Sequence, residues 1–177
     1  MLKGIFLFLL TLSLTSVWIA QSCEAKLGEP FGVFQARIIT NYKFKAHSKK
    51  DDRDYYMYSM VTDADTDVAA PGFGGGLTIT VSRGLIVGQS MILRIGNNTQ
   101  AGKSLAALHT FDFAFESLGR PTPPSQTAIE QELHSYTNAV NKAIAGAPQN
   151  IRYPGGGAKI TIAKRSDGAL AIAATPE

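Results

Sequence analysis

Residues 125–148, SQTAIEQELHSYTNAVNKAIAGAP, carry the clearest structural signal in this chain of 177 residues. Apolar side chains recur there at every third or fourth position, which places them on one stripe of a helix. They are Ile129, Leu133, Tyr136, Val140 and Ile144. The hydroxyl residues and prolines at 122–125 supply a start, and Gly146 suits the left-handed residue that follows a helix. The pattern predicts one long amphipathic helix over about 125–145.

Strand patterns precede this helix. Stretches rich in β-branched and aromatic residues, or with alternating apolar and polar residues, are typical of strands. They occupy residues 31–44, 54–62, 77–82, 85–95 and 110–116. In the last of them, TFDFAFE, Phe111, Phe113 and Phe115 would share one face. The polar segments 45–53 and 97–103 are predicted to be loops between strands.

Two further strands are predicted after the helix, at 159–164 and 169–174, and Asp167-Gly168 between them is typical of a hairpin turn. Neighbouring strands with short turns favour antiparallel pairing, and one helical stripe needs one apolar surface to cover. We therefore predict an α+β fold: a curved antiparallel sheet of about five to seven strands, packed with one long helix and ending in a β-hairpin. The helical stripe is expected to pack against the phenylalanine face of the sheet.

The first 25 residues resemble a secretory signal peptide. Lys3 precedes an apolar segment that runs from Ile5 to about Ala20, and Cys23-Glu24-Ala25 resembles a signal-peptidase site. The segment is shorter than the roughly 20 apolar residues that span a bilayer. We predict cleavage after Ala25, which leaves residues 26–177 as a single secreted or periplasmic domain with no transmembrane span.

Cys23 is the only cysteine of the chain. After cleavage the domain therefore has no disulfide, and packing must stabilise it. The alternative is that Cys23 becomes the lipid-anchored first residue of a bacterial lipoprotein, although Gln21 stands where such signals usually carry a small residue.

The segment IGNNTQAGKS, residues 95–104, ends like a phosphate-binding loop. Such a loop needs a glycine five residues before the Gly of its Gly-Lys-Ser/Thr ending, and that position, 97, is Asn. An alternating strand pattern follows, where a phosphate-binding loop needs a helix. We therefore predict no nucleotide site here.

Asp63, Asp65 and Asp67 form the strongest chemical signal. Carboxylates on alternate residues can converge on one hard cation, as they do at the start of an EF-hand loop. Val68 and Gly74 stand where that loop requires Gly and Glu, so the sequence predicts at most weak calcium binding and no other cofactor. The alternative is a solvated acidic turn at the end of a strand.

His47, His109 and His134 are the only histidines, and neither an HExxH nor a GxSxG motif is present. The basic segment 43–53 also contains Asp51 and Asp52, which leaves it too weakly charged to predict nucleic-acid binding. Its charge favours anionic envelope polymers instead.

These observations predict an exported, non-catalytic module that binds a partner protein, an envelope polymer or a small apolar ligand. The alternative from another class is a small extracytoplasmic hydrolase that uses His109 or His134 with a nearby carboxylate. The sequence predicts no oligomeric state.

Overall fold

The structure, a computed structural model, describes residues 26–37, 42–96, 99–118, 125–152 and 158–176. The predicted signal peptide, with its cleavage site and Cys23, lies outside the described residues.

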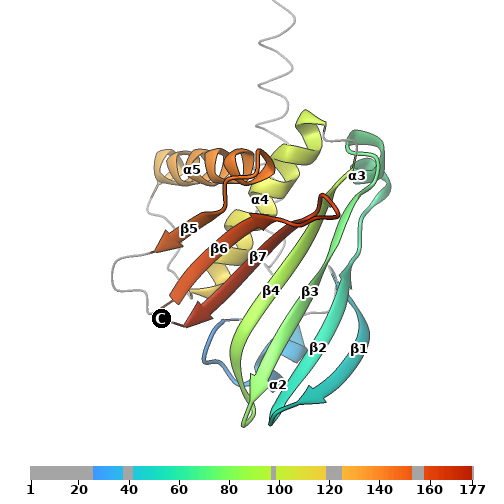
Figure 1. Cartoon of the computed structure of the whole chain (residues 1–177), viewed down its shortest axis with the longest axis vertical. Helices are drawn as coiled ribbons and strands as arrows, with labels where there is room; N and C mark the ends of the chain where they lie inside the picture. Colours follow the sequence, from blue (N-terminus) through green and yellow to red (C-terminus); the bar gives the residue numbers. More distant parts are fainter. Residues whose placement is uncertain (1–25, 38–41, 97–98, 119–124, 153–157, 177) are drawn as a thin grey trace, which may run out of the picture.

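The described residues form one antiparallel sheet of seven strands, in the order β1-β2-β3-β4-β7-β6-β5 (Figure 1). The strands are β1 (Tyr42–Lys50), β2 (Arg53–Met60), β3 (Phe73–Ser82), β4 (Leu85–Ile95), β5 (Gln149–Arg152), β6 (Ala158–Lys164) and β7 (Leu170–Pro176). Consecutive strands pair from β1 to β4 and again from β5 to β7. The pairing of β4 with β7 joins the two groups into one twisted sheet.

Four helices occur in the described residues: α2 (Phe31–Arg37), α3 (Ala64–Ala69), α4 (Gln100–Ser117) and α5 (Gln126–Ile144). Both α4 and α5 contact the face of the sheet formed by β4 to β7, and they also contact each other. The shorter α2 covers the β1–β2 side of the same face. No helix among the described residues lies across the opposite face, which is turned toward the viewer in Figure 1.

The predicted helix at 125–145 is present as α5. The Ser125 side chain accepts a hydrogen bond from the Ala128 N–H at 3.2 Å, and Gly146 follows the helix with a positive φ of 97°. Tyr136 and Val140 of the stripe are buried, and Leu133 and Ile144 are partly buried and pack against the core. The prediction was wrong in making this the one long helix of the fold.

The strand predicted at 110–116 is wrong, and so is the loop predicted at 97–103 from Gln100 onward, because these residues belong to the 18-residue helix α4. Residues 97 and 98 of the predicted loop lie outside the described residues. Thr99 caps this helix by accepting a hydrogen bond from the Gly102 N–H at 3.1 Å. The helix packs against β4 and β7 and also against α5, so Phe111 and Phe113 are both buried although they are only two positions apart. The ring of Phe111 lies edge-on to the ring of Tyr136 of α5, with 5.6 Å between the centroids. The predicted contact between the helical stripe and the phenylalanines therefore joins two helices and not a helix and a sheet.

The strand predicted at 31–44 is also wrong in its first part. Residues 31–37 form α2, whose Phe31 stacks on Tyr56 at 4.0 Å between ring centroids. The charged stretch predicted as a loop continues β1 and begins β2, with only Asp51 and Asp52 in the turn. Both turn residues have positive φ, as a tight hairpin turn requires.

The C-terminal strands enter the sheet in an order that the sequence did not predict. β6 and β7 pair with each other, but β7 lies against β4 in the interior and β5 forms the edge. β5 has only four residues, and the other edge strand, β1, carries several lysines and a bulge between Phe44 and Ala46. Short or lysine-rich, irregular edges disfavour pairing with a further strand.

Because Phe113 is fully buried, Phe113→Ala should lower the free energy of unfolding by about 3–5 kcal/mol. Denaturant unfolding measures this change. The control is Ser104→Ala, an exposed position of the same helix, for which a change within about 0.5 kcal/mol is expected. Equal effects of the two substitutions would contradict the placement of α4.

Candidate functional site

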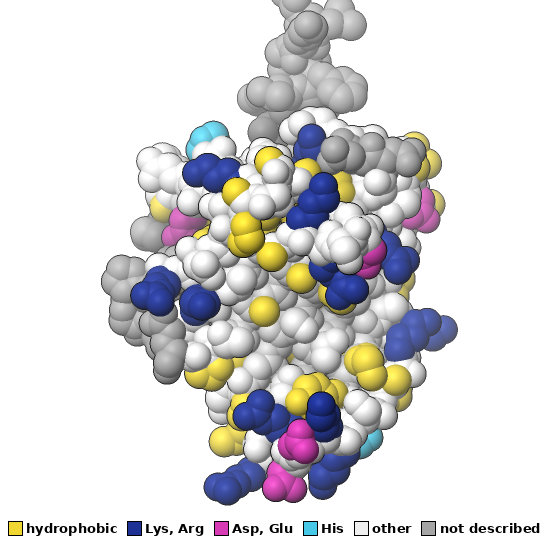
Figure 2. All heavy atoms as spheres, in the orientation of Figure 1, with side chains coloured by type: hydrophobic (Ala, Val, Ile, Leu, Met, Phe, Trp, Pro, Cys, Tyr) yellow, Lys and Arg dark blue, Asp and Glu magenta, His cyan; other side chains and the backbone are white. Residues whose placement is uncertain are grey.

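The candidate site is the face of the sheet that the described helices leave uncovered, here called the open face. Residues opposite each other in the antiparallel ladders share a face, so the registers align side chains in rows. One row crosses all seven strands and is called the central row: Asn150, Thr161, Ala173, Ser90, Thr78, Met57 and Ala46. Most of its side chains are small and uncharged. Figure 2 shows this face, with white and yellow side chains at its centre and Lys and Arg mainly toward its margins.

The charged strand residues of the open face all have the same sign. At the strand positions of the open face, all charged side chains are basic: Lys43, Lys50, Arg53, Arg94, Arg152 and Lys159. Asp54 is the one acidic residue within the seven strands, and it belongs to the other face, because its register partner is the buried Val81. The open face is therefore more basic than the formal net charge of +3 for the whole chain indicates.

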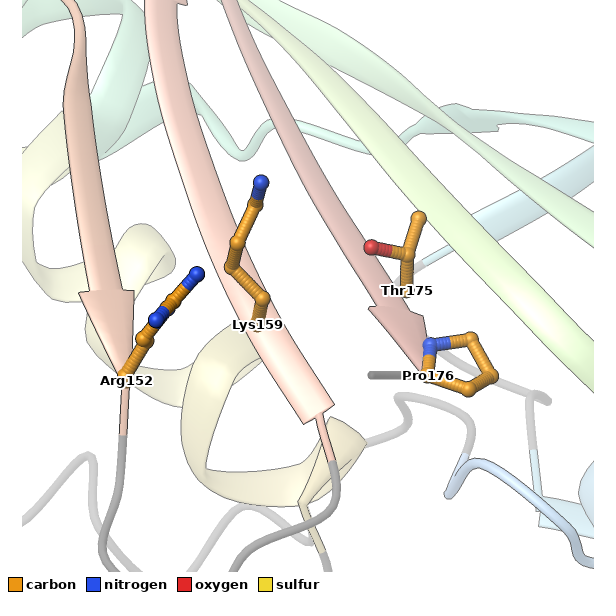
Figure 3. A pocket seen from close by; sticks show the side chains of 4 residues that line it. All are labelled: Arg152, Lys159, Thr175 and Pro176. Carbon is orange, nitrogen blue, oxygen red and sulfur yellow. The ribbon is translucent and has the colours of Figure 1, made fainter.

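A shallow hollow of about 400 Å³ lies at one end of the open face, lined by Arg152, Lys159, Thr175 and Pro176 (Figure 3). Arg152 stands directly opposite Lys159, and Lys159 stands opposite Thr175. These three residues from β5, β6 and β7 are called the basic row. Arg152 and Lys159 therefore concentrate positive charge at this end of the open face.

The predicted metal residues lie at the start of α3. Asp63 caps that helix by accepting a hydrogen bond from the Thr66 N–H at 2.7 Å, and hydrogen bonding to Thr66 lowers the pKa of Asp63. Asp65 and Asp67 follow in the first helical turn. No group of three or more His, Cys, Asp or Glu side chains in the described part of the chain is arranged to hold a metal ion. Weak calcium binding at these carboxylates stays a prediction.

His109 lies on α4 and stacks on Phe73 at 5.6 Å, and its burial lowers its pKa to about 4. Asp112 follows one turn later, where burial and, to a smaller extent, Glu116 raise its pKa to about 7. Within the described residues, no hydrogen bond joins His109 to Asp112, and exposed His134 of α5 has no carboxylate partner. The structure therefore brings neither predicted histidine into a catalytic arrangement with a carboxylate.

His47 forms the pair that sequence reasoning missed. Its Nε2 lies 2.8 Å from Asp54 Oδ1, and its ring stacks on Tyr56 at 4.6 Å. These contacts join β1 to β2 across the hairpin. The sequence offered no signal for this pair, because it depends on the hairpin register, which was not predicted.

The residues of the open face were also missed as a site. Thr78, Thr80, Lys159 and Thr161 are visible in the sequence as the polar positions of alternating strands. Their alignment with Arg152 and Ser90 depends on strand order, which no local pattern indicates.

No described helix is both long enough and apolar enough to cross a membrane. Comparison of the chain with protein-family models, curated proteins and solved structures gave no match, so the functional argument rests on the geometry described above.

The opposite pKa shifts of Asp112 and His109 predict opposite pH effects on stability. Asp112 has a raised pKa, so its contribution is complete below its ordinary value of 3.8 and is lost as pH rises to about 7. His109 has a lowered pKa, so its contribution is complete above 6.5 and is lost as pH falls to about 4.

Relative to the wild type, Asp112→Asn should therefore gain stability as pH rises from about 4 to 7, by up to about 1.4 kcal/mol per unit of pKa shift. His109→Gln should gain relative stability as pH falls over the same range, on top of a constant loss from the Phe73 contact. Thermal unfolding across this pH range measures both trends. Parallel pH profiles for the two variants would contradict the burial of these groups.

Weak calcium binding is tested by calorimetry at millimolar calcium. The wild type should bind no more tightly than in the millimolar range, and Asp65→Ala should abolish the signal, because it removes one of three carboxylates. Tight binding that Asp65→Ala leaves unchanged would show that other residues are the ligands. Asp63→Ala is a less clean test, since it also removes the helix cap, at a cost of about 1 kcal/mol.

Proposed function

We propose that the protein is an exported, non-catalytic binding module whose open face holds an anionic envelope polymer. The uniform sign of the open face carries this proposal: all its charged strand residues are basic. A basic surface attracts acidic ligands and increases their rate of association, with a strength that salt reduces.

The size and chemistry of the face favour a polymer over a folded protein partner. Seven strands spaced about 4.8 Å apart give a surface roughly 29 Å wide. Thr and Ser hydroxyls along it can donate and accept hydrogen bonds, which suits a hydroxylated, charged chain. Large apolar side chains at its strand centres are few, mainly Tyr55, Met57 and Ile92, whereas the centre of a protein interface is usually apolar.

Gly88 gives the open face a flat path from β7 to β3. Its neighbour on β3 is Thr80, and the β4–β7 register places it beside Thr175. A Cβ added at Gly88 would meet no atom closer than 3.8 Å, so packing does not require a glycine here. The missing side chain instead leaves room for a ligand to lie across the strands.

The first described residues support export with cleavage after Ala25. The Leu27 N–H donates to the Ser117 carbonyl at 3.1 Å, and the Gly28 N–H donates to the Ile86 carbonyl at 2.8 Å. Both donors follow Ala25 in the chain, so cleavage there would leave these two hydrogen bonds in place.

The proposal predicts that residues 26–177 bind dextran sulfate, with an affinity that falls as salt rises, and do not bind neutral dextran. Lys43→Gln/Arg94→Gln should weaken binding by about tenfold, because both cations lie on the open face. The matched control is Lys49→Gln/Lys142→Gln, which removes the same charge from exposed positions off that face. Calorimetry at two salt concentrations measures the affinity of the wild type and of both double variants for dextran sulfate.

Equal loss of affinity in the two double variants would show that only the overall charge matters and would contradict a role for the open face. Equal binding to neutral dextran would contradict the anionic character of the ligand.

A further inference from the structure

We infer that the basic row, Arg152, Lys159 and Thr175, is an oxyanion subsite that takes a phosphate or sulfate group. The inference rests on the proposed function, and it names the chemical group of the polymer that this end of the open face recognises.

The geometry brings three donors together from three strands. Residues directly opposite each other in antiparallel strands have Cβ atoms about 4.5–5.5 Å apart. Figure 3 shows the guanidinium of Arg152 leaning toward Lys159 and the hydroxyl oxygen of Thr175 pointing back toward the same side chain. All three lie on the open side of the sheet and line one hollow.

The electrostatics of the basic row favour an anion. Arg152 and Lys159 place two positive charges side by side at this end of the open face, and these charges attract an anion.

The donor set suits a tetrahedral oxyanion better than a carboxylate. Arginine presents a planar fork that can bind two oxygens, lysine adds a compact charge, and threonine adds a hydroxyl donor. A carboxylate has two oxygens, which the arginine fork alone can satisfy. A phosphate or sulfate ester has three outer oxygens and can engage all three side chains.

The openness of the hollow indicates an oxyanion that stays attached to a larger molecule. The hollow is shallow, and Arg152 and Thr175 are exposed. Beyond Thr175 the same line of the sheet continues over Gly88 toward Thr80. A polymer that carries phosphate or sulfate esters could place one ester in the hollow and extend along this flat path.

Backbone amide NMR titration of residues 26–177 with inorganic phosphate, sulfate and acetate, at constant ionic strength, tests the subsite. Phosphate and sulfate should shift the amide signals of residues 152, 159 and 175, whereas acetate should shift them less. Arg152→Gln/Lys159→Gln should weaken phosphate binding by about tenfold or more. Thr175→Val should weaken it by a smaller factor, and Lys49→Gln/Lys142→Gln, off the open face, should leave it unchanged.

A stability measurement shows whether a variant that does not bind phosphate is still folded. Phosphate should raise the unfolding temperature of the wild type and not that of Arg152→Gln/Lys159→Gln, because only a ligand of the folded state stabilises it. Without phosphate, this variant should unfold at about the same temperature as the wild type, because neither side chain belongs to the buried core.

The outcomes separate this inference from the proposed function. Binding of dextran sulfate without any phosphate shift at the basic row overturns the subsite and leaves the polymer proposal standing. Equal shifts by acetate overturn the preference for a tetrahedral oxyanion. If phosphate binds at the basic row but dextran sulfate does not bind, the basic row is a site for the free ion. That outcome overturns the inference that the oxyanion belongs to a polymer.

Discussion

The pairing of β4 with β7 is the contact on which the rest of the structure depends. Five residues of β4, Gln89 to Leu93, lie opposite β7 and join two groups of strands that are far apart in the sequence. Because the last strand inserts beside the fourth, the chain between them must cross to the far edge of the sheet. Helices α4 and α5 make this crossing on one face. The other face is therefore continuous across all seven strands, and its side chains align in rows.

Elements with strong local signals were predicted from the sequence, and elements defined by their surroundings were not. Helix α5 shows a stripe and a cap, and the strands at 77–82 and 159–164 alternate, because each has one buried and one exposed side. Helix α4 is buried on two sides, so its apolar residues do not form a single stripe. Its phenylalanines occur at alternate positions, which is the pattern of a strand. Strand order and register depend on contacts between distant residues, so no local pattern could provide them.

The same distinction applies to the candidate site. Sequence reasoning favours residues with conspicuous chemistry, and it selected Asp63 and His109. The structure uses Asp63 as a helix cap and packs His109 against an aromatic ring. The open face is built from residues with little individual signal, namely threonines, serines, alanines and scattered cations on separate strands. Their significance comes from juxtaposition, which gives the open face charged side chains of one sign only.

The edge strands of the sheet affect how copies of the protein could associate. Four-residue β5 and the bulged, lysine-bearing β1 give a second copy no regular ladder to extend. Copies bound to the same polymer would then be spaced by the length that each one covers, roughly 29 Å if the chain runs across the strands. Occupancy would rise in proportion to polymer length, without the sharp threshold that contacts between neighbouring copies produce. Copies on such a polymer would bind independently of one another and would not assemble into a filament.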